Sequence, residues 1–248
     1  MLRVFWHITI FVFLTILTQV GGIAWIVALF FRRRLLVFVV AYAGISLAVT
    51  QIAPQFGRVP ISCLDDGPLQ VQSPMYCALN RTYVTPELAA VLQDTAETVA
   101  TRHPGTITLM LDGSFPFLDG FPLLPHLSHD DGEKADLAFY YTDDTGYLPG
   151  KAASPIGYFA FEDGPTDCPA RWADMRWDLA WLQPLWPDYS LDASRNRTVL
   201  EVMAADPRVG KIFVEPHLLR RWGVADPKIR FQGCRAARHD DHIHMQLR

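Results

Sequence analysis

The sequence predicts an α+β protein with an N-terminal two-helix transmembrane hairpin, and its charge distribution carries this prediction. Residues 1–53 contain no Asp or Glu, and their only permanently charged basic side chains are Arg3, Arg32, Arg33 and Arg34. The other 195 residues carry 18 Lys and Arg against 26 Asp and Glu, and helical and strand-like patterns follow one another along them. We therefore expect a membrane part followed by one water-exposed domain with a buried core.

The overall composition excludes two classes of protein. Half of the residues are hydrophobic and 19% are charged, whereas a disordered chain has few apolar residues. The formal net charge is −4, whereas a protein that binds nucleic acid through its phosphates needs an excess of basic side chains. We therefore expect a folded protein with no nucleic-acid partner.

Two long apolar runs predict the transmembrane hairpin. Residues 4–31 and 35–53 contain no Asp, Glu, Lys or Arg, and a helix of about 20 apolar residues crosses the hydrocarbon core. The alternative is a cleaved signal peptide, but its apolar region has only about 7–15 residues and no second span follows it. Arg32, Arg33 and Arg34 lie between the two runs, and positively charged loops stay in the cytoplasm. Both ends of the hairpin, and the domain after it, are then expected to face the periplasm or the cell exterior.

The four cysteines, Cys63, Cys77, Cys168 and Cys234, all follow the second apolar run. An even number of cysteines in an oxidising compartment predicts two disulfides. Of the three pairings we favour Cys63–Cys77 with Cys168–Cys234, because the first bond would staple the segment that leaves the membrane. The alternative, a zinc site of four thiolates, needs a closely spaced pair of cysteines, and the sequence has none.

Patterns in the rest of the chain divide it into a linker and lead-in segment, residues 54–80, and a folded domain, residues 81–248. A helix is predicted to begin after Thr85, with Pro86 at its first position and Glu87 in its first turn. Trp177, Trp181 and Trp186 are expected to pack on an amphipathic helix rather than line a groove. The predicted strands are 106–111, 135–141, 157–161, 211–215 and 242–248, and the other predicted helices are 173–182 and 193–205.

Two short windows contain five of the eight histidines. In the C-terminal window, His242 and His244 alternate with Ile243 and Met245. Successive side chains of a strand point to opposite faces, so the apolar pair would face the core and both imidazoles would project into a common site. By itself a His-x-His pattern is a weak signal, because a polar strand face gives the same pattern.

The other window, residues 125–136, contains His126, His129 and Asp136. Gly132 permits a turn that brings His129 close to Asp136 at the start of a predicted strand. Two ligands from this window and one from the last strand would make three, and three protein ligands plus a water is the arrangement of a catalytic zinc site. Imidazole and carboxylate ligands also favour zinc over calcium, which prefers oxygen only.

These two windows resemble those of a known family of zinc peptidases, which includes D-Ala-D-Ala dipeptidases, lysostaphin-type enzymes and the hedgehog signalling domain. The resemblance rests on a Ser-His-x-x-Gly-x-x-x-Asp pattern and a C-terminal His-x-His, here Ser128 to Asp136 and His242 to His244. His126 and His239 make the chain most similar to the penicillin-insensitive murein endopeptidases, as does the Arg-Trp-Asp sequence at 176–178. The similarity covers residues 81–248, and the apolar runs lie outside it.

The resemblance implies one compact α+β zinc-peptidase-like domain with a central antiparallel sheet. It implies that Zn²⁺ is bound by three ligands, His129, Asp136 and His244. It implies that the catalytic groups are His242, His239, His126 and Asp241. We rank His242 above Asp241 as the proton-transfer group, with His239 close behind, because strand alternation turns Asp241 away from the site unless the strand begins after it.

The function expected from this resemblance is hydrolysis of amide bonds in peptidoglycan peptides by a zinc-activated water, in the manner of a D,D-endopeptidase that cuts cross-links. The protein would lie in the bacterial inner membrane and expose its C-terminal domain to the periplasm or cell exterior. Three alternatives stay open: a D,D-carboxypeptidase or dipeptidase, a non-catalytic zinc-containing module that binds the cell wall or a partner, and a metal-free assembly factor. Fold alone does not decide among them.

Overall fold

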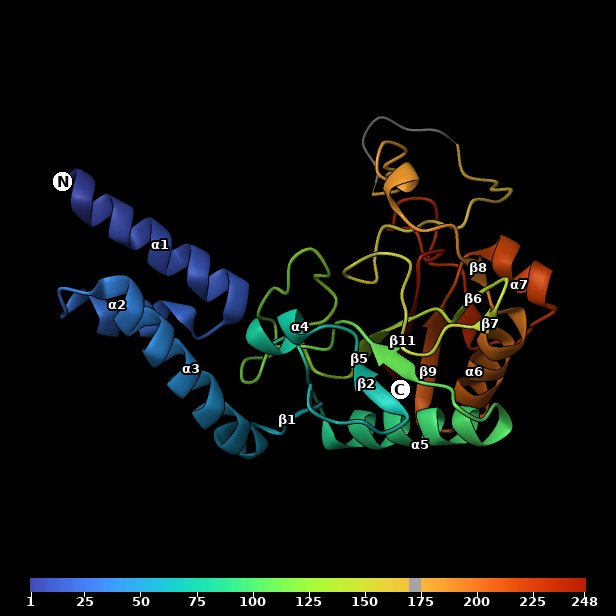
Figure 1. The fold of residues 1–248 in the computed structure, drawn as a ribbon, viewed down its shortest axis with the longest axis horizontal. Helices are drawn as coiled ribbons and strands as arrows, with labels where there is room; N and C mark the ends of the chain where they lie inside the picture. Colours follow the sequence, from blue (N-terminus) through green and yellow to red (C-terminus); the bar gives the residue numbers. More distant parts are fainter. Residues whose placement is uncertain (170–174) are drawn as a thin grey trace.

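A mixed six-stranded sheet forms the centre of the C-terminal domain in the computed structural model, which describes residues 1–169 and 175–248 (Figure 1). Its strand order is β10-β9-β11-β5-β4-β2. The bounds are β2 Leu69–Val71, β4 Thr108–Met110, β5 Lys134–Ala138, β9 Val209–Phe213, β10 Ile229–Arg230 and β11 His242–Leu247. The four central strands pair antiparallel, and the outer pairs β10–β9 and β2–β4 are parallel. The predicted α+β class and the antiparallel centre of the sheet are therefore confirmed.

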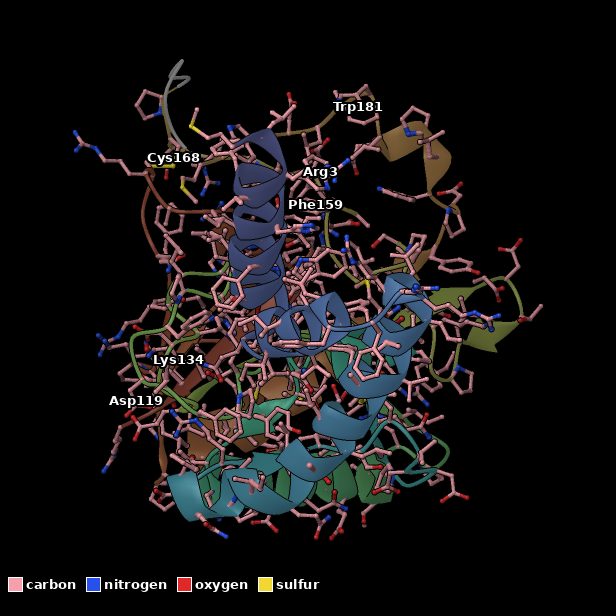
Figure 2. All side chains as sticks on the ribbon, turned by 90° about the vertical axis from the view of Figure 1, so that its left-hand side faces the viewer. Arg3, Asp119, Lys134, Phe159, Cys168 and Trp181 are labelled. Atoms are coloured by element: carbon pink, nitrogen blue, oxygen red, sulfur yellow. A yellow bond between two sulfur atoms is a disulfide. The ribbon has the colours of Figure 1, made fainter. Side chains whose placement is uncertain are left out.

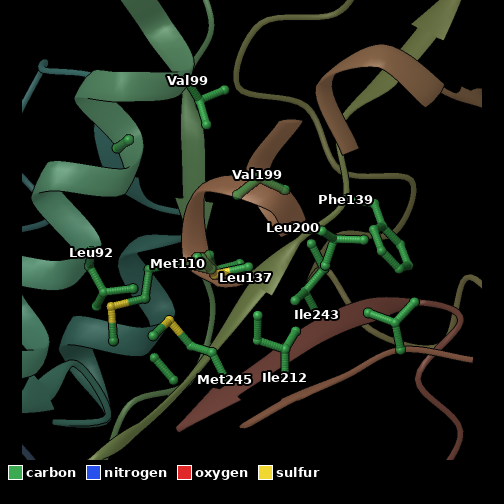
Figure 3. Close-up of a cluster of buried hydrophobic side chains, with 14 of the residues drawn as sticks. Leu92, Val99, Met110, Leu137, Phe139, Val199, Leu200, Ile212, Ile243 and Met245 are labelled. Carbon is green, nitrogen blue, oxygen red and sulfur yellow. The ribbon is translucent and has the colours of Figure 1, made fainter. Parts of the chain in front are cut away.

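Two long helices supply the core of this domain together with the sheet. Helix α5 (Pro86–Arg102) begins after Thr85, whose hydroxyl accepts a hydrogen bond from the backbone N–H of Leu88, and α6 (Ala193–Ala205) has the predicted bounds. Figure 3 shows side chains of α5, α6 and the central strands in one apolar cluster. Each fully buried Leu, Ile or Met in it contributes about 1.5–3 kcal/mol, so this cluster is the main source of stability.

Shorter elements surround the sheet. Two small antiparallel sheets pair β1 with β3 and join β7, β6 and β8. The bounds of the remaining elements of the domain are β1 Val59–Pro60, α4 Pro74–Ala78, β3 Tyr83–Val84, β6 Tyr141–Asp143, β7 Gly146–Tyr147, η2 Gln183–Leu185, β8 Ser190–Leu191 and α7 Pro216–Trp222.

The segment 54–80, predicted to be a linker, contributes two strands and a helix to the domain. β2 is an edge strand of the central sheet and pairs in parallel with β4, while β1 pairs with β3. The linker prediction is thus wrong for these elements. Two or three residues are too few to show the alternation that identifies a strand, and their partners lie far along the chain.

The predicted strand at 157–161 is absent from the described chain, because other groups occupy its backbone. Phe159 has a φ of 65°, and its backbone N–H donates to Asp241 Oδ2 at 2.7 Å. The side chain of Gln183 accepts from the N–H of Phe161 at 3.1 Å and donates to the carbonyl of Phe159 at 2.9 Å. These side-chain bonds replace a strand ladder, and the segment becomes an irregular wall beside the sheet.

The prediction of a helix at 173–182 is wrong where the structure describes it. Ala173 lies outside the described residues, and residues 175–182 form no helix. Trp177 and Trp181 are 61% and 72% exposed, so they do not pack on a helix as expected, and Trp181 lies at the upper edge of the domain in Figure 2. Trp186 is half-buried and donates its indole N–H to the carbonyl of Phe159 at 2.9 Å.

The first apolar run is two helices, not the single span predicted for residues 4–31. α1 (Leu2–Thr18) ends at Gln19, whose φ is 64°, and the chain turns there into α2 (Gly21–Leu29). α2 has nine residues and at 1.5 Å per residue is about 14 Å long, too short to cross a bilayer alone. Gly22 permits the close packing of the two helices, because a Cβ there would lie 2.1 Å from Thr15 Oγ1.

The second apolar run forms α3 (Arg34–Ile52), which continues into the 3₁₀ turn η1 (Ala53–Phe56). Among the described residues, the stretch Arg34–Phe56 is the one helical stretch long and apolar enough to span a membrane. Its 23 residues rise about 34 Å, compared with about 30 Å for the hydrocarbon core. The prediction of an apolar helix here is confirmed.

Both predicted disulfides are present, Cys63–Cys77 and Cys168–Cys234. They close loops of very different size, with sequence separations of 14 and 66 residues. In the chain-entropy description, a crosslink stabilises a protein more when it closes a longer loop, by about 3 kcal/mol for the shorter loop and about 4 kcal/mol for the longer one.

Replacing both Cys168 and Cys234 by Ser is therefore expected to lower the free energy of unfolding by about 4 kcal/mol. Denaturant titration of the detergent-solubilised full chain, followed by a spectroscopic signal of the C-terminal domain, measures this loss. The matched change of Cys63 and Cys77 is expected to cost about 3 kcal/mol. A larger loss for the shorter loop would contradict the entropic argument.

Candidate metal centre

Strand β11 presents two histidines on the face of the sheet opposite the core. Ile243 and Met245 are fully buried in the apolar cluster, and His242 and His244 project from the other side. The predicted alternation is therefore confirmed. The antiparallel register with β5 places His244 directly opposite Asp136. Cross-strand neighbours of this kind lie close enough for their side chains to touch.

Three side-chain atoms converge at this point of the sheet. Asp136 Oδ1 lies 2.8 Å from His244 Nδ1 and 3.2 Å from His129 Nε2, and the two ring nitrogens are 3.1 Å apart. All three residues are at least 96% buried. Zinc binds nitrogen and oxygen ligands at about 2.0–2.2 Å in tetrahedral geometry, which sets neighbouring ligand atoms about 3.3 Å apart. The donor set and its dimensions could therefore hold a metal ion.

His129 reaches this triangle from the long segment between β4 and β5. Its Nδ1 lies 2.9 Å from the carbonyl oxygen of Gly113, so Nε2 is the nitrogen that faces Asp136. Gly132, which follows three residues later, has a φ of 74°, and a Cβ there would lie 2.4 Å from Arg58 Nε. The glycine predicted to turn the chain between His129 and Asp136 is thus required by both its backbone conformation and its surroundings.

His126 lies beside the triangle. Among the described residues, His126, His129 and Asp136 form a group whose ligand atoms lie within 4.8 Å of one another and could hold a metal ion. His126 Nδ1 is 2.9 Å from Asp112 Oδ2 and 3.3 Å from Asp136 Oδ2, so carboxylate oxygens already engage this nitrogen.

Three residues that sequence reasoning missed hold these groups in place. Arg81 forms a bidentate ion pair with Asp112, at 2.5 and 2.8 Å, and Asp112 is 1% exposed. Burial opposes ionisation of this carboxyl, but hydrogen bonds from His126 and Arg81 outweigh it and lower the pKa of Asp112. Tyr158 donates to Asp136 Oδ2 at 2.7 Å and to Asp112 Oδ2 at 3.1 Å. Tyr158 thus leaves Asp136 Oδ1 free to face the two histidines.

The hydroxyl of Tyr158 is a permanent donor. Burial, and then the charges of Asp112 and Asp136, hold the pKa of Tyr158 well above its usual range. The carboxyl group of Asp136, which accepts this hydrogen bond, stays ionised. Burial opposes its ionisation, but His129 and His242 outweigh burial and hold the pKa of Asp136 well below its usual value. A protonated phenol therefore meets an ionised carboxylate, which makes a strong charge-assisted hydrogen bond.

His242 is held by its neighbour in sequence. β11 begins at His242, so Asp241 lies before the strand, and its Oδ1 is 2.5 Å from His242 Nδ1. His242 Nε2 lies 3.8 Å from Asp136 Oδ1, beside the triangle. Burial opposes protonation of this ring, but Asp241 and Asp136 outweigh it and raise the pKa of His242 to about 9. Asp241 therefore orients His242, as second carboxylates do for active-site histidines.

The other histidines of the site have different protonation preferences. Burial lowers the pKa of His244 to about 4, against the opposing effect of Asp136. Burial also disfavours charged His129, but Asp136 outweighs it and raises the pKa of His129. His239 is 5% exposed, its ring centroid lies 4.9 Å from that of His242, and its Nδ1 has no hydrogen-bond partner among the described residues. Burial, and then His242 and His244, hold the pKa of His239 well below its usual value.

A pocket of about 280 Å³ opens above the triangle. All seven residues predicted for the site line it, namely His126, His129, Asp136, His239, Asp241, His242 and His244. Its apolar lining includes Leu127, Phe159, Phe161, Met175 and Trp177. The structure therefore brings the two histidine windows together in one cleft with polar groups at its base.

Two further histidines lie away from this pocket. His217 is 6% exposed at the first turn of α7, and its Nε2 lies 2.7 Å from the carbonyl oxygen of Glu162. The segment around Gly164 packs against the same ring. His103 ends α5, and its Nε2 lies 2.9 Å from Thr198 Oγ1.

Removing the phenol that orients Asp136 has a predictable consequence. Tyr158→Phe is expected to weaken zinc binding by about 10- to 100-fold, since groups that orient metal ligands contribute this much to affinity. Competition titration of the full chain with a chromophoric zinc chelator measures the change. Tyr147→Phe is the matched control, because Tyr147 bonds the backbone of Ile107, outside the pocket. Equal affinities for the two variants would show that Tyr158 has no such role.

No protein-family model matches this chain, and no curated protein sequence matches it.

Proposed function

We propose that this protein is a membrane-anchored zinc metallopeptidase that hydrolyses amide bonds in peptidoglycan peptides, in the manner of a D,D-endopeptidase that cuts cross-links. The observation that carries the proposal is the triangle of His129 Nε2, Asp136 Oδ1 and His244 Nδ1, with edges of 2.8–3.2 Å at the base of a pocket. Three ligands of this kind leave a fourth coordination position for water or substrate, as in catalytic zinc sites.

Zinc bound here would supply a Lewis acid for the scissile carbonyl and lower the pKa of a water molecule to about 7. The residues around it supply the rest of the chemistry. His242 carries a proton at Nε2, beside the triangle, and Asp241 holds its other nitrogen. His242 can therefore stabilise an oxyanion or pass a proton to the leaving amine. His126, fixed by Asp112, offers a second imidazole to the substrate.

His239 and Asp241 are assigned supporting roles in this proposal. The low pKa of His239 keeps its ring neutral, so it can accept or donate a hydrogen bond without adding charge beside the metal site. Asp241 engages both His242 Nδ1 and the backbone N–H of Phe159, and this argues for positioning rather than for direct attack. His242 therefore keeps the first rank as the proton-transfer group.

The cellular setting belongs to the same proposal. Helix α3 with η1 is long and apolar enough to span a membrane, and Arg32, Arg33 and Arg34 stand at its start. Positive residues of this kind stay on the cytoplasmic side. The C-terminal domain would then face the periplasm or cell exterior, where its two disulfides are stable and where peptidoglycan is found.

The test is a digest of cross-linked peptidoglycan fragments by the zinc-loaded full chain in detergent, with His129→Ala alongside, followed by mass spectrometry. Conversion of cross-linked dimers to monomers by the wild type alone would support the proposal. Release of only a terminal D-Ala would replace it by a D,D-carboxypeptidase. Stoichiometric zinc with no hydrolysis would replace it by a non-catalytic zinc module.

A further inference from the structure

The apolar helices are docked on the C-terminal domain rather than tethered to it. Val49 and Ala53, near the end of α3, are 3% and 0% exposed, and they form an apolar cluster with Val20 and with Tyr83 of the domain. The strand β1 begins at Val59, so only a few residues separate the helix from the folded domain. This junction fixes the position of the domain relative to the C-terminal end of α3.

Buried amide side chains lock the same junction. Gln19, in the turn between α1 and α2, is 8% exposed, and its Oε1 accepts from the backbone N–H of Phe117 at 3.0 Å. Asn80 of the domain donates to Tyr42 of α3 at 3.1 Å and to the carbonyl of Thr18 at 3.4 Å. These bonds tie the end of α1 and the middle of α3 to the domain. They give the buried polar groups partners that lipid cannot offer.

Phe117 belongs to the segment that carries two residues of the site. Residues 115–129 contain His126 and His129, and their one Asp, Glu, Lys or Arg is Asp119, which forms an ion pair with Arg58. The segment lies beside the end of α1 in Figure 1. It contacts the end of α3 as well, since the rings of Phe56 and Phe117 are 5.1 Å apart.

Large apolar side chains are exposed at Phe56 of this contact and along the segment as far as Leu127. We call them the lip, and they are Phe56, Leu118, Leu124 and Leu127, which are 51–57% exposed. Leu127 also lines the pocket. Exposed apolar residues that are contiguous with a membrane helix are typical of a surface that rests in the interface of the bilayer.

The arginines at the ends of the apolar helices indicate which end of the helical part faces the cytoplasm. In Figure 1 the N-terminus and the turn between α2 and α3 lie together at the end of the helical part that is far from the domain. Arg3 and Arg32 to Arg34 are therefore at one end, because the turn at Gln19 reverses the chain. By the positive-inside rule this end is cytoplasmic. The N-terminus would thus lie in the cytoplasm, rather than outside as the two-helix hairpin predicts.

We propose that the lip rests on the outer surface of the bilayer, so that the pocket opens at the membrane and takes peptides held close to it. The substrate class is then a cross-linked peptide on a membrane-anchored molecule, such as newly made peptidoglycan that is still linked to lipid, rather than a cross-link deep in the wall. The statement about the substrate rests on the proposed peptidase function, but the position of the lip does not.

The position of the lip is tested without any activity. The described chain has no free cysteine, so Leu118→Cys and, as a matched control, Leu185→Cys each introduce one labelling site. Leu185 is similarly exposed but lies on η2, which backs the pocket wall at residues 159–161. In vesicles of phosphatidylethanolamine and phosphatidylglycerol with nitroxide-labelled lipids, a fluorophore at residue 118 is expected to lose its fluorescence and one at residue 185 to keep it. Equal fluorescence at the two sites would overturn the proposal.

The substrate class is tested with one peptide attached to a lipid through spacers of increasing length, in the same vesicles as the zinc-loaded full chain. Cleavage is expected to fall by roughly tenfold or more once the spacer exceeds the height of the domain, since effective concentration falls with linker length. A rate independent of spacer length would overturn the substrate assignment. Quenching at residue 118 without cleavage of any peptide would leave the lip in place and reject the proposed peptidase function instead.

Discussion

His129→Ala is expected to abolish stoichiometric zinc binding and to reduce peptide hydrolysis to the level of the buffer. His129 supplies one of three ligand atoms in a triangle that is 96–99% buried, and its Nε2 lies 3.2 Å from Asp136 Oδ1. Loss of a ligand costs more than loss of a group that merely orients one, which already weakens affinity by about 10- to 100-fold. Metal analysis of the purified full chain and a titration with zinc measure the loss.

Stability supplies a second readout for the same variant. A ligand that binds only the folded state adds about 4 kcal/mol when it is present at 1,000 times its Kd. Zinc is therefore expected to raise the unfolding temperature of the wild type and to leave that of His129→Ala unchanged. His103→Ala serves as the control, because it removes a histidine that contacts Thr198 and lies outside the pocket. If zinc stabilised His129→Ala as much as the wild type, the metal would be bound elsewhere.

The placement of the histidines on their own segments could be predicted, because its determinants are local. Alternation along residues 242–248 placed His242 and His244 on one face, and Gly132 allowed His129 to approach Asp136. What local pattern could not supply is the pairing of β11 with β5, since His244 and Asp136 are 108 residues apart. That contact was expected only through the resemblance of the two histidine windows to a peptidase family.

The residues that orient the triangle could not be predicted, because no local pattern marks them and their partners lie far along the chain. Asp112 follows the buried strand β4, and Arg81 precedes β3, so their ion pair joins segments 31 residues apart. A carboxylate directly after a buried strand was the one signal in the sequence, because such a group needs a partner when the fold buries it. Tyr158 was placed on a strand, and only the bonds of its neighbours to Gln183 and Asp241 show why no strand forms.

Hydropathy predicted the apolar N-terminal region but not the break of its first run into two helices. The run of residues 4–31 is continuous in composition, and Gln19 is one polar residue among many apolar ones. The break occurs because the side chain of Gln19 bonds the backbone of Phe117, 98 residues away, and because Gly21 and Gly22 let the two helices approach. A long-range contact of this kind leaves no periodic signal in the sequence.

His242→Ala is expected to lower the rate of hydrolysis by about 10²–10⁴-fold while zinc stays bound at one equivalent, because general acid–base groups contribute this much. The argument rests on position: Nε2 of His242 lies 3.8 Å from Asp136 Oδ1, next to the triangle but without closing it. Single-turnover hydrolysis and metal analysis on the same preparation separate the two effects. Full activity with zinc still bound would remove His242 from the first rank and leave His239 and His126 as the candidates.

Asp241→Asn distinguishes a positioning carboxylate from a direct base. The amide in this variant would keep an oxygen that accepts from His242 Nδ1 but would lose the charge that raises the pKa of His242 to about 9. If Asp241 acts through His242, the variant loses less rate than His242→Ala, and the double variant loses no more than His242→Ala alone, because effects of residues in one unit are not additive. Asp131→Asn controls for the charge, since Asp131 pairs with Lys134 rather than with the site. Independent, multiplicative losses would instead assign Asp241 a contact of its own with the reacting atoms.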